Sequence, residues 1–277
     1  MKYVLEHMSW PQAEELFKSK NLIALIPIGS HEQHGPHLPM STDNVIADRS
    51  AYAAADLVAD EMDVLICPSV YYGYTMHNMD FPGTMTLRSS TLIDLGVDLA
   101  TSLVHHGCKK IVFVSTHGSN FSVLDLVSRE LMNRHPDVLV AIASPMKMAA
   151  REIEDLREAK AIGGMSHACE LETSLMLHLD PANVDMSRAV CDLNQPKSDF
   201  YFRDMTRGGK GVACADLSRH ITRTGAVGDP TLATAAKGKV FFEIIVSTLA
   251  RFLREFIERE IKIVAEISIT HSKTEIE

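Results

Sequence analysis

Residues 22–39 of the chain read LIALIPIGSHEQHGPHLP. The first seven are apolar and predict a buried β-strand, Leu22–Ile28, that ends at a glycine. The residues that follow include three histidines and a glutamate within seven positions, and Asp43 comes soon after. Carboxylates and neutral imidazoles together bind Zn²⁺, Mn²⁺ or Fe²⁺. A metal site at the end of this strand is therefore the first hypothesis.

Strand and helix patterns alternate along the rest of the chain. Apolar runs predict strands at Val64–Cys67, Ile111–Ser115 and Val138–Ala143. Apolar periodicity predicts helices at Asn44–Asp60, Ser90–His106, Phe121–Arg134, Lys147–Lys160 and Glu170–Leu179, and a long amphipathic helix near the C-terminus. Such alternation favours the α/β class, with a layered domain built on a mainly parallel sheet.

Composition narrows the functional classes. The chain has 277 residues and a formal net charge of -9, so nucleic-acid binding through phosphate contacts is not expected. It has no apolar run near the ~20 residues that span a bilayer and no signal-peptide pattern. Its five cysteines form no CxxC pair, which is typical of a reduced protein. We expect a cytoplasmic protein that acts on a small molecule and contacts no membrane.

Two later stretches carry polar side chains toward the same edge of the sheet. Thr116-His117-Gly118-Ser119-Asn120 follows the predicted strand Ile111–Ser115. Sites in parallel sheets form beyond the carboxyl ends of the strands, so we expect His117 to reach the residues after Ile28. His167 and Glu170 are three residues apart, and this spacing puts both on one face if a helix has begun there.

Simpler explanations apply to some of these residues. A loop histidine is most often a surface group or a hydrogen-bonded structural group, and we favour that interpretation for His31 and His37. Asp43 alone could cap the helix that follows it. Glu32 and His34 lie two positions apart, so an extended backbone points both side chains the same way. Together with Asp43 they fit the ligand rules of a metal site.

Five motifs resemble the signature of the creatininase (creatinine amidohydrolase) family, and they stand in the family's order over about residues 20–240. They are Gly29–Pro39, Phe81-Pro82-Gly83-Thr84, Thr116–Asn120, His167–Ser174 and Gly228-Asp229-Pro230-Thr231. The resemblance implies a single-domain, three-layer α/β/α fold over residues 1–265, followed by a polar C-terminal tail at 266–277. It also implies a binuclear metal centre and a homo-oligomer, commonly a hexamer.

The resemblance also implies roles for single residues. Glu32, His34, Asp43 and His117 match metal ligands, with Asp43 bridging two ions, and His167 matches a catalytic histidine. Creatininase has a further glutamate ligand where this chain has Ser119. We expect Glu170 to replace it, with Glu172 as the alternative. Contacts with the substrate or with the ligands are expected from Gln33, Ser119, Glu172 and His77.

The expected activity is that of a hydrolase that uses two divalent ions, Zn²⁺ or Mn²⁺ or else Fe²⁺, to attack a carbonyl carbon. A cyclic amide is the favoured substrate, but not creatinine, because Trp10 is the one tryptophan in the chain and creatininase packs its substrate against later tryptophans. Four alternatives stay open: a formamide, the C–C bond of a cyclic ketone in inositol or sugar catabolism, a sugar isomerase, and a non-catalytic metal-binding scaffold.

Overall fold

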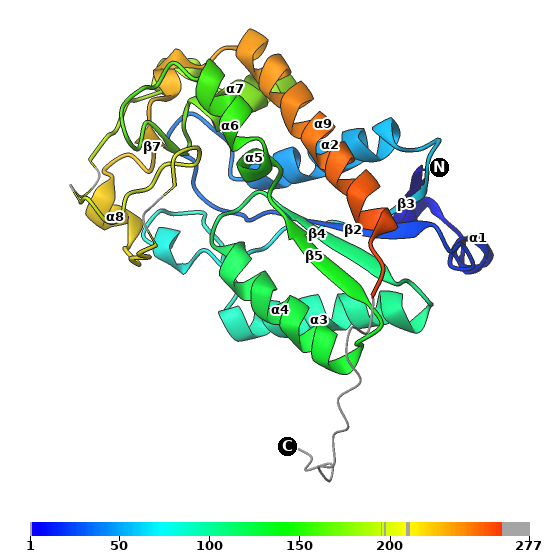
Figure 1. The fold of residues 1–277 in the computed structure, drawn as a ribbon. Helices are drawn as coiled ribbons and strands as arrows, with labels where there is room; N and C mark the ends of the chain where they lie inside the picture. Colours follow the sequence, from blue (N-terminus) through cyan, green and yellow to red (C-terminus); the bar gives the residue numbers. More distant parts are fainter. Residues whose placement is uncertain (1, 195, 197, 209–210, 262–277) are drawn as a thin grey trace.

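The computed structural model describes residues 2–194, 196, 198–208 and 211–261. A five-stranded sheet lies at its centre, with the strand order β1-β3-β2-β4-β5 and every neighbouring pair parallel (Figure 1). The strands are β1 (Lys2–Val4), β2 (Leu22–Ile28), β3 (Asp63–Ile66), β4 (Lys110–Ser115) and β5 (Leu139–Ala143). A separate antiparallel pair joins β6 (Met165–His167) and β7 (Val227–Gly228).

Helices cover both faces of the central sheet (Figure 1). The α-helices are α1 (Trp10–Leu16), α2 (Thr42–Leu57), α3 (Ser89–His105), α4 (Asn120–Arg134), α5 (Pro145–Met148), α6 (Ala150–Leu156), α7 (Glu170–Leu179), α8 (Ser218–Ile221) and α9 (Ala235–Glu258). Short 3-10 turns lie at Leu5–His7, Met76–Asn78, Pro181–Asn183, Met186–Arg188 and Pro230–Leu232. In the described part of the chain, no helix combines the length and the apolar character needed to cross a membrane.

Strand β2 shows why the sheet is buried between two helical layers. All seven of its residues are buried. Ala24 and Ile26 pack in the core that also contains residues of α3 and α4, whereas Ile23 and Leu25 pack in the core shared with α2 and α9. Successive side chains of a strand point to opposite faces, so an unbroken apolar run is what a strand between two cores needs.

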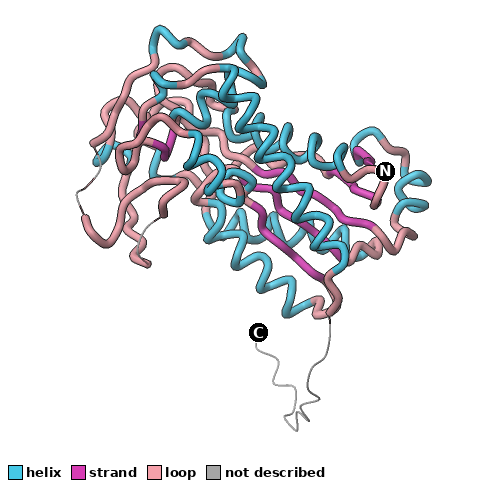
Figure 2. The backbone as a smooth tube through the Cα atoms, turned by 45° about the horizontal axis from the view of Figure 1, so that its top comes forward, coloured by secondary structure: helices cyan, strands magenta, loops and turns pink. Residues whose placement is uncertain are grey.

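The chain changes direction across the sheet next to β2. Helix α2 leads from β2 to its neighbour β3, and α3 then leads from β3 to β4 on the other side of β2. This reversal makes a topological switch point at the carboxyl ends of β2 and β4, where α/β sheets place their binding sites. Loops and short helices gather at this end of the sheet (Figure 2).

The predicted fold class is confirmed: this is a single-domain α/β structure with a parallel central sheet between helical layers. Strand β2 and helix α7 have the predicted limits. The helix predicted at Lys147–Lys160 is instead two short helices, α5 and α6, since Ala149 departs from helical geometry and Arg157 adopts an extended backbone. The domain limit at residue 265 stays a prediction, and the predicted tail at 266–277 lies outside the described residues.

Candidate metal centre

A glycine contact fixes the start of the site. Gly29 follows β2, and a Cβ atom built there would lie 2.3 Å from Asn44 Oδ1 and 2.6 Å from the Asn44 backbone nitrogen. Only a residue without a side chain lets the start of α2 approach the end of β2 this closely. Asn44 Nδ2 then donates to the Ser30 carbonyl at 3.0 Å, and Thr116 Oγ1 donates to the Asp43 carbonyl at 2.7 Å. These contacts hold Asp43 beside the residues that follow β2.

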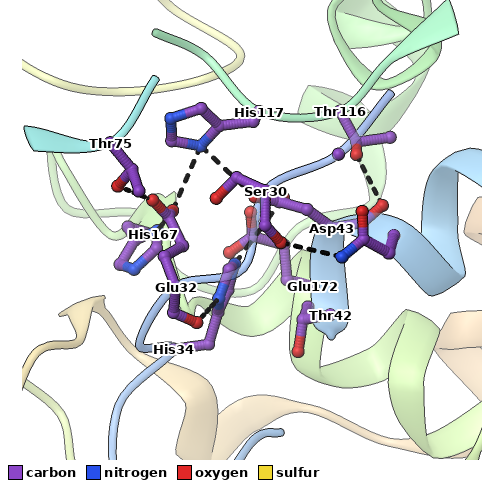
Figure 3. A network of polar contacts seen from close by, with 12 residues as sticks. Ser30, Glu32, His34, Thr42, Asp43, Thr75, Thr116, His117, His167 and Glu172 are labelled. Carbon is purple, nitrogen blue, oxygen red and sulfur yellow. Dashed lines mark hydrogen bonds and ion pairs between the residues drawn. The ribbon is translucent and has the colours of Figure 1, made fainter. Parts of the chain in front are cut away.

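Six side chains from distant segments turn toward a common centre (Figure 3). They are Glu32, His34, Asp43, His117, His167 and Glu172. Three groups bring their ligand atoms within 4.8 Å of one another: Glu32 with His34 and His167, Glu32 with His77 and His117, and His34 with Asp43 and Glu172. The structure thus brings together five of the six residues predicted to act as ligands or in catalysis.

Unsatisfied polar atoms lie at this centre. Among the described residues, Glu32 Oε1, His34 Nε2 and Asp43 Oδ2 are buried and have no hydrogen-bond partner. A buried polar atom left unpaired is unfavourable, and native proteins rarely keep one without a use for it. Three such atoms in one carboxylate and imidazole cluster fit the ligand chemistry of a divalent transition metal.

The carboxylate of Asp43 lies between two histidines. Its Oδ1 atom is 3.6 Å from His34 Nε2, and its Oδ2 atom is 3.2 Å from His117 Nδ1. Each oxygen therefore belongs to a different set of ligand atoms. This arrangement suits a carboxylate that bridges two ions. Asp43 is the second residue of α2, after the N-cap Ser41, and its side chain serves this cluster rather than capping the helix.

The histidines are oriented through their second ring nitrogens. His34 Nδ1 lies 3.1 Å from the Glu32 carbonyl, and His117 Nε2 lies 3.1 Å from the Tyr74 carbonyl. Because a carbonyl only accepts, the nitrogen beside it must donate, and the opposite nitrogen presents a lone pair in the neutral ring. Metal-binding histidines are usually held in this way.

Charges within the cluster shift the pKa values of its members. Burial lowers the pKa of His34, but its interactions with Asp43 and the charges of Glu172 and Glu32 together raise it to about 9. Burial raises the pKa of Asp43, but the nearby charges of His34 and His117 reverse this and lower it to about 2. Carboxylates that ionise so readily attract cations, and metal binding would displace protons from the imidazoles.

Two residues outside the predicted set hold Glu32. Its Oε2 atom accepts hydrogen bonds from Thr75 Oγ1 and, at 3.0 Å, from Asn78 Nδ2. Asn78 Oδ1 in turn accepts from Gln33 Nε2 at 3.0 Å. Thr75 was not identified from sequence, because a single threonine in a long loop has no distinguishing pattern. The polar stretch before the Phe81–Thr84 motif was the available signal.

His167 lies at the edge of the cluster in a defined orientation. Its Nε2 atom lies 2.8 Å from the Gln33 carbonyl and therefore donates to it, which leaves the Nδ1 lone pair 3.7 Å from Glu32 Oε1. Burial, followed by the charge of His34, lowers the pKa of His167 to about 4. The ring is therefore neutral near pH 7, with Nδ1 able to accept a proton.

The position of Glu170 corrects the expected ligand set. Its carboxylate accepts the backbone N–H groups of Glu158 and Ala159 and lies 2.8 Å from Lys237 Nζ, so it does not turn toward the cluster. Glu172 takes the place beside His34 and Asp43. Burial raises the pKa of Glu172 to about 7, and the charge of Asp43 acts in the same direction.

The remaining predicted residues lie around this centre. His77 stacks on His117 with ring centroids 5.9 Å apart, and burial lowers the pKa of His77. Ser119 is the N-cap of α4 and lines the cavity. His31 and His37 belong to none of the ligand groups found in the described residues. His37 is buried against Thr173 Oγ1 at 2.8 Å, which agrees with a structural use.

The cluster opens into a cavity of about 910 Å³. Glu32, Asp43, His117 and Glu172 line this cavity, and so do residues 202–208. Ligand pockets for small molecules are on the order of 300–1,000 Å³. The metal centre therefore adjoins a space large enough for a substrate.

A family model described as creatinine amidohydrolase matches residues 6–253. The chain belongs to the creatininase family. A solved structure titled "Creatininase Mn" has a TM-score of 0.76 and 25% sequence identity, and the match covers 94% of this chain and 100% of that one. The α/β/α fold that the resemblance implied is therefore confirmed for this creatininase-family chain.

Several curated members of the creatininase family are similar over most of their length. A mycofactocin precursor peptide peptidase of Mycolicibacterium smegmatis is 30% identical, over 88% of this chain and 91% of that protein. A creatinine amidohydrolase of Pseudomonas putida is 28% identical, over 90% and 95%. A 3-dehydro-scyllo-inosose hydrolase of Thermotoga maritima is 26% identical, over 91% and 83%. These relatives are all hydrolases, but they differ in the substrates that their names give.

Proposed function

We propose that this protein is a binuclear metal-dependent hydrolase that cleaves an amide bond. The main support is the bridging position of Asp43, whose two oxygens face His34 and His117 inside a cluster of unpaired ligand atoms. Zn²⁺ and Mn²⁺ are the proposed ions, with Fe²⁺ as an alternative, because mixed carboxylate and imidazole ligands suit all three.

The ligands divide into two sets around Asp43. Glu32 and His117 would hold one ion with Asp43, whose Oδ2 atom lies beside His117, and His77 is close enough to Glu32 and His117 to contribute. His34 and Glu172 would hold the other ion with Asp43. This assignment replaces Glu170, the sequence-based choice, with Glu172.

The chemistry depends on a carbonyl, a water molecule and a proton carrier. Divalent ions held here would polarise the substrate carbonyl and lower the pKa of water. The Nδ1 atom of neutral His167 can accept a proton from the attacking water and deliver it to the leaving nitrogen. The bond from His167 Nε2 to the Gln33 carbonyl holds the ring in that orientation throughout.

A short peptide is the preferred substrate class. A cavity on the order of 150 Å³ already accommodates a single six-membered ring. The space beside this cluster is about 910 Å³, which leaves room for an extended chain with side groups. The relative from Mycolicibacterium smegmatis is named as a peptide peptidase and supports the same choice. A cyclic amide other than creatinine is the second candidate, supported by the creatinine amidohydrolase relative.

A substrate panel tests this proposal. Protein loaded with Zn²⁺, Mn²⁺ or Fe²⁺ is offered short peptides, lactams, formamides and cyclic ketones, and amine or acid products are measured. We expect turnover of an amide that falls at least about 100-fold in His167→Asn while metal content is kept. Turnover of ketones alone would replace the amide proposal with C–C hydrolysis. If the metal-loaded protein turns over no carbonyl substrate, the hydrolase proposal fails. The protein would then be a non-catalytic metal-binding scaffold.

Two further expectations from the sequence stay predictions. A cytoplasmic location rests on the composition of the chain, and a hexameric assembly rests on the family. Size measurement in solution checks the second.

A further inference from the structure

A buried ion pair lies beside the cavity and takes no part in the proposed chemistry. Arg157 Nη1 donates to Asp204 Oδ1 at 2.7 Å, and neither side chain is exposed. An ion pair this deeply buried gains little net stability, because both charges lose their hydration. Its main contribution is directional, because a planar guanidinium donates hydrogen bonds only in fixed directions.

The pair joins two segments that are distant in sequence. Arg157 also donates to the carbonyls of Ala159 and Ala161, and so fixes the loop that follows α6. Asp204 accepts the backbone N–H of Gly163 at 2.8 Å from the same loop. It also accepts the N–H groups of Thr206 and Arg207 at 3.2 and 3.3 Å, within residues 202–208. We call residues 202–208 the cavity wall, because all seven line the cavity.

Glu170 anchors the other end of this connection. Its buried carboxylate accepts the N–H groups of Glu158 and Ala159, next to Arg157 in the chain. Lys237 Nζ on α9 neutralises it at 2.8 Å and also donates to the Leu232 carbonyl. Two ion pairs, Lys237–Glu170 and Arg157–Asp204, are therefore linked through the backbone of Glu158 and Ala159.

We infer that Arg157, Asp204 and Glu170 are positioning residues that set substrate specificity by holding the cavity wall in the cavity that the candidate metal centre also lines. This inference rests on the proposed function for its substrate. Asp204 alone of the three lines the cavity, so Arg157 and Glu170 act through it and through the loop after α6. A wall fixed by directional bonds keeps one cavity shape, whereas an apolar contact would allow it to slide.

Asp204→Asn is the test variant, because it removes the charge and keeps the size. Asp125→Asn is the matched control, since it removes an exposed ion pair to Arg129 at 2.8 Å. In Asp204→Asn we expect KM for the amide substrate to rise at least about tenfold, with kcat within about threefold and metal content unchanged. In Asp125→Asn, both KM and kcat should equal the wild-type values. A purely structural role would lower the active fraction and leave KM unchanged.

Hydrogen exchange gives a second readout that needs no turnover. Backbone amides of Thr206 and Arg207 should exchange at least about tenfold faster in Asp204→Asn, while those of β4 stay protected. If Asp204→Asn does not fold, the double variant Arg157→Met with Asp204→Leu removes both charges and should show the same two effects.

Unchanged exchange in the cavity wall, or an unchanged KM in a folded variant, overturns the inference. Loss of metal together with a parallel fall in kcat also overturns it, because the pair would then support the metal centre. If the wild-type protein hydrolyses no amide, the proposed function fails separately, and the exchange result still decides whether the pair holds the wall.

Discussion

Two glutamates on the first turn of α7 have different uses. Glu172 faces His34 and Asp43, whereas Glu170 points away and binds backbone N–H groups and Lys237. Both are buried, so burial alone does not distinguish a ligand from an anchor. Their partners do, since unpaired ligand atoms surround one carboxylate and hydrogen-bond donors surround the other.

The two glutamates can be separated by substitution. Glu172→Gln should lose about one metal per chain, because a neutral amide is a poor ligand for a divalent ion. Glu170→Gln should keep both metals but lower Tm by about 3–8 °C, as its donors lose a charged acceptor. Metal analysis and thermal melting measure the two effects. Loss of metal in Glu170→Gln would show that Glu170 is a metal ligand, as the sequence predicted.

Asn78 supports the ligand Glu32. Asn78→Ala removes the donor to Glu32 Oε2, so metal affinity should fall about 10–100-fold without loss of the fold. Asn183→Ala removes an exposed amide that donates to the Asp180 carboxylate, and it serves as the control. Competition with a chromophoric chelator measures both. Equal affinity in Asn78→Ala and wild type would show that Thr75 alone orients Glu32.

At the scale of elements, the junction of β2 with α2 carries the site. The close contact between Gly29 and Asn44 sets where Asp43 lies relative to Glu32 and His34. A strand end and a helix start held this tightly cannot shift independently. The proposed metal centre would therefore be as rigid as the two elements that support it.

This junction predicts a large effect of one methyl group. Gly29→Ala puts a Cβ within 3 Å of the α2 backbone and should cost about 1–3 kcal/mol in unfolding free energy. Gly118→Ala is the control, since its Cβ meets no atom within 4 Å. Denaturant unfolding compares the two. A Gly29→Ala protein as stable as Gly118→Ala would contradict the role of this contact.

The attachment of α6 to the cavity wall predicts acid sensitivity. Burial raises the pKa of Glu154, but hydrogen bonds from Thr206 and Arg207 and the charge of Arg157 lower it to about 2. Because the folded value lies below the ordinary 4.5, Glu154 stabilises the fold above pH 4.5 and loses this contribution as pH falls toward 2. The gap in Tm between wild type and Glu154→Gln should shrink over that range. A gap that stays constant would mean that Glu154 contributes no charge-dependent stability.

At the scale of the whole molecule, much of the fold follows from local patterns. Apolar runs located β2 and β4, and parallel topology then placed His117 beside Glu32 and His34. The use of Glu172 in place of Glu170 did not follow, because Glu170 was chosen from the family resemblance and from a helical spacing that was applied across a turn. His167 belongs to β6, α7 begins at Glu170, and Ala168 between them has φ 49. Spacing rules for a helix do not hold through a left-handed residue.

Other parts of the molecule depend on long-range contacts that a sequence does not display. Strand β1 has three residues and is defined by its pairing with β3. The Arg157–Asp204 pair joins residues 47 positions apart through one buried contact. Neither leaves a periodic pattern, so both become visible only in three dimensions.

The binuclear centre is the claim on which the rest depends, and metal stoichiometry tests it most directly. The protein and its Asp43→Ala variant are loaded with Zn²⁺ or Mn²⁺, freed of excess metal and analysed by mass spectrometry of the elements. The bridging position of Asp43 predicts two ions per chain in the wild type and the loss of both in the variant. One ion or none in the wild type, or two ions kept by Asp43→Ala, would contradict a centre bridged by this carboxylate.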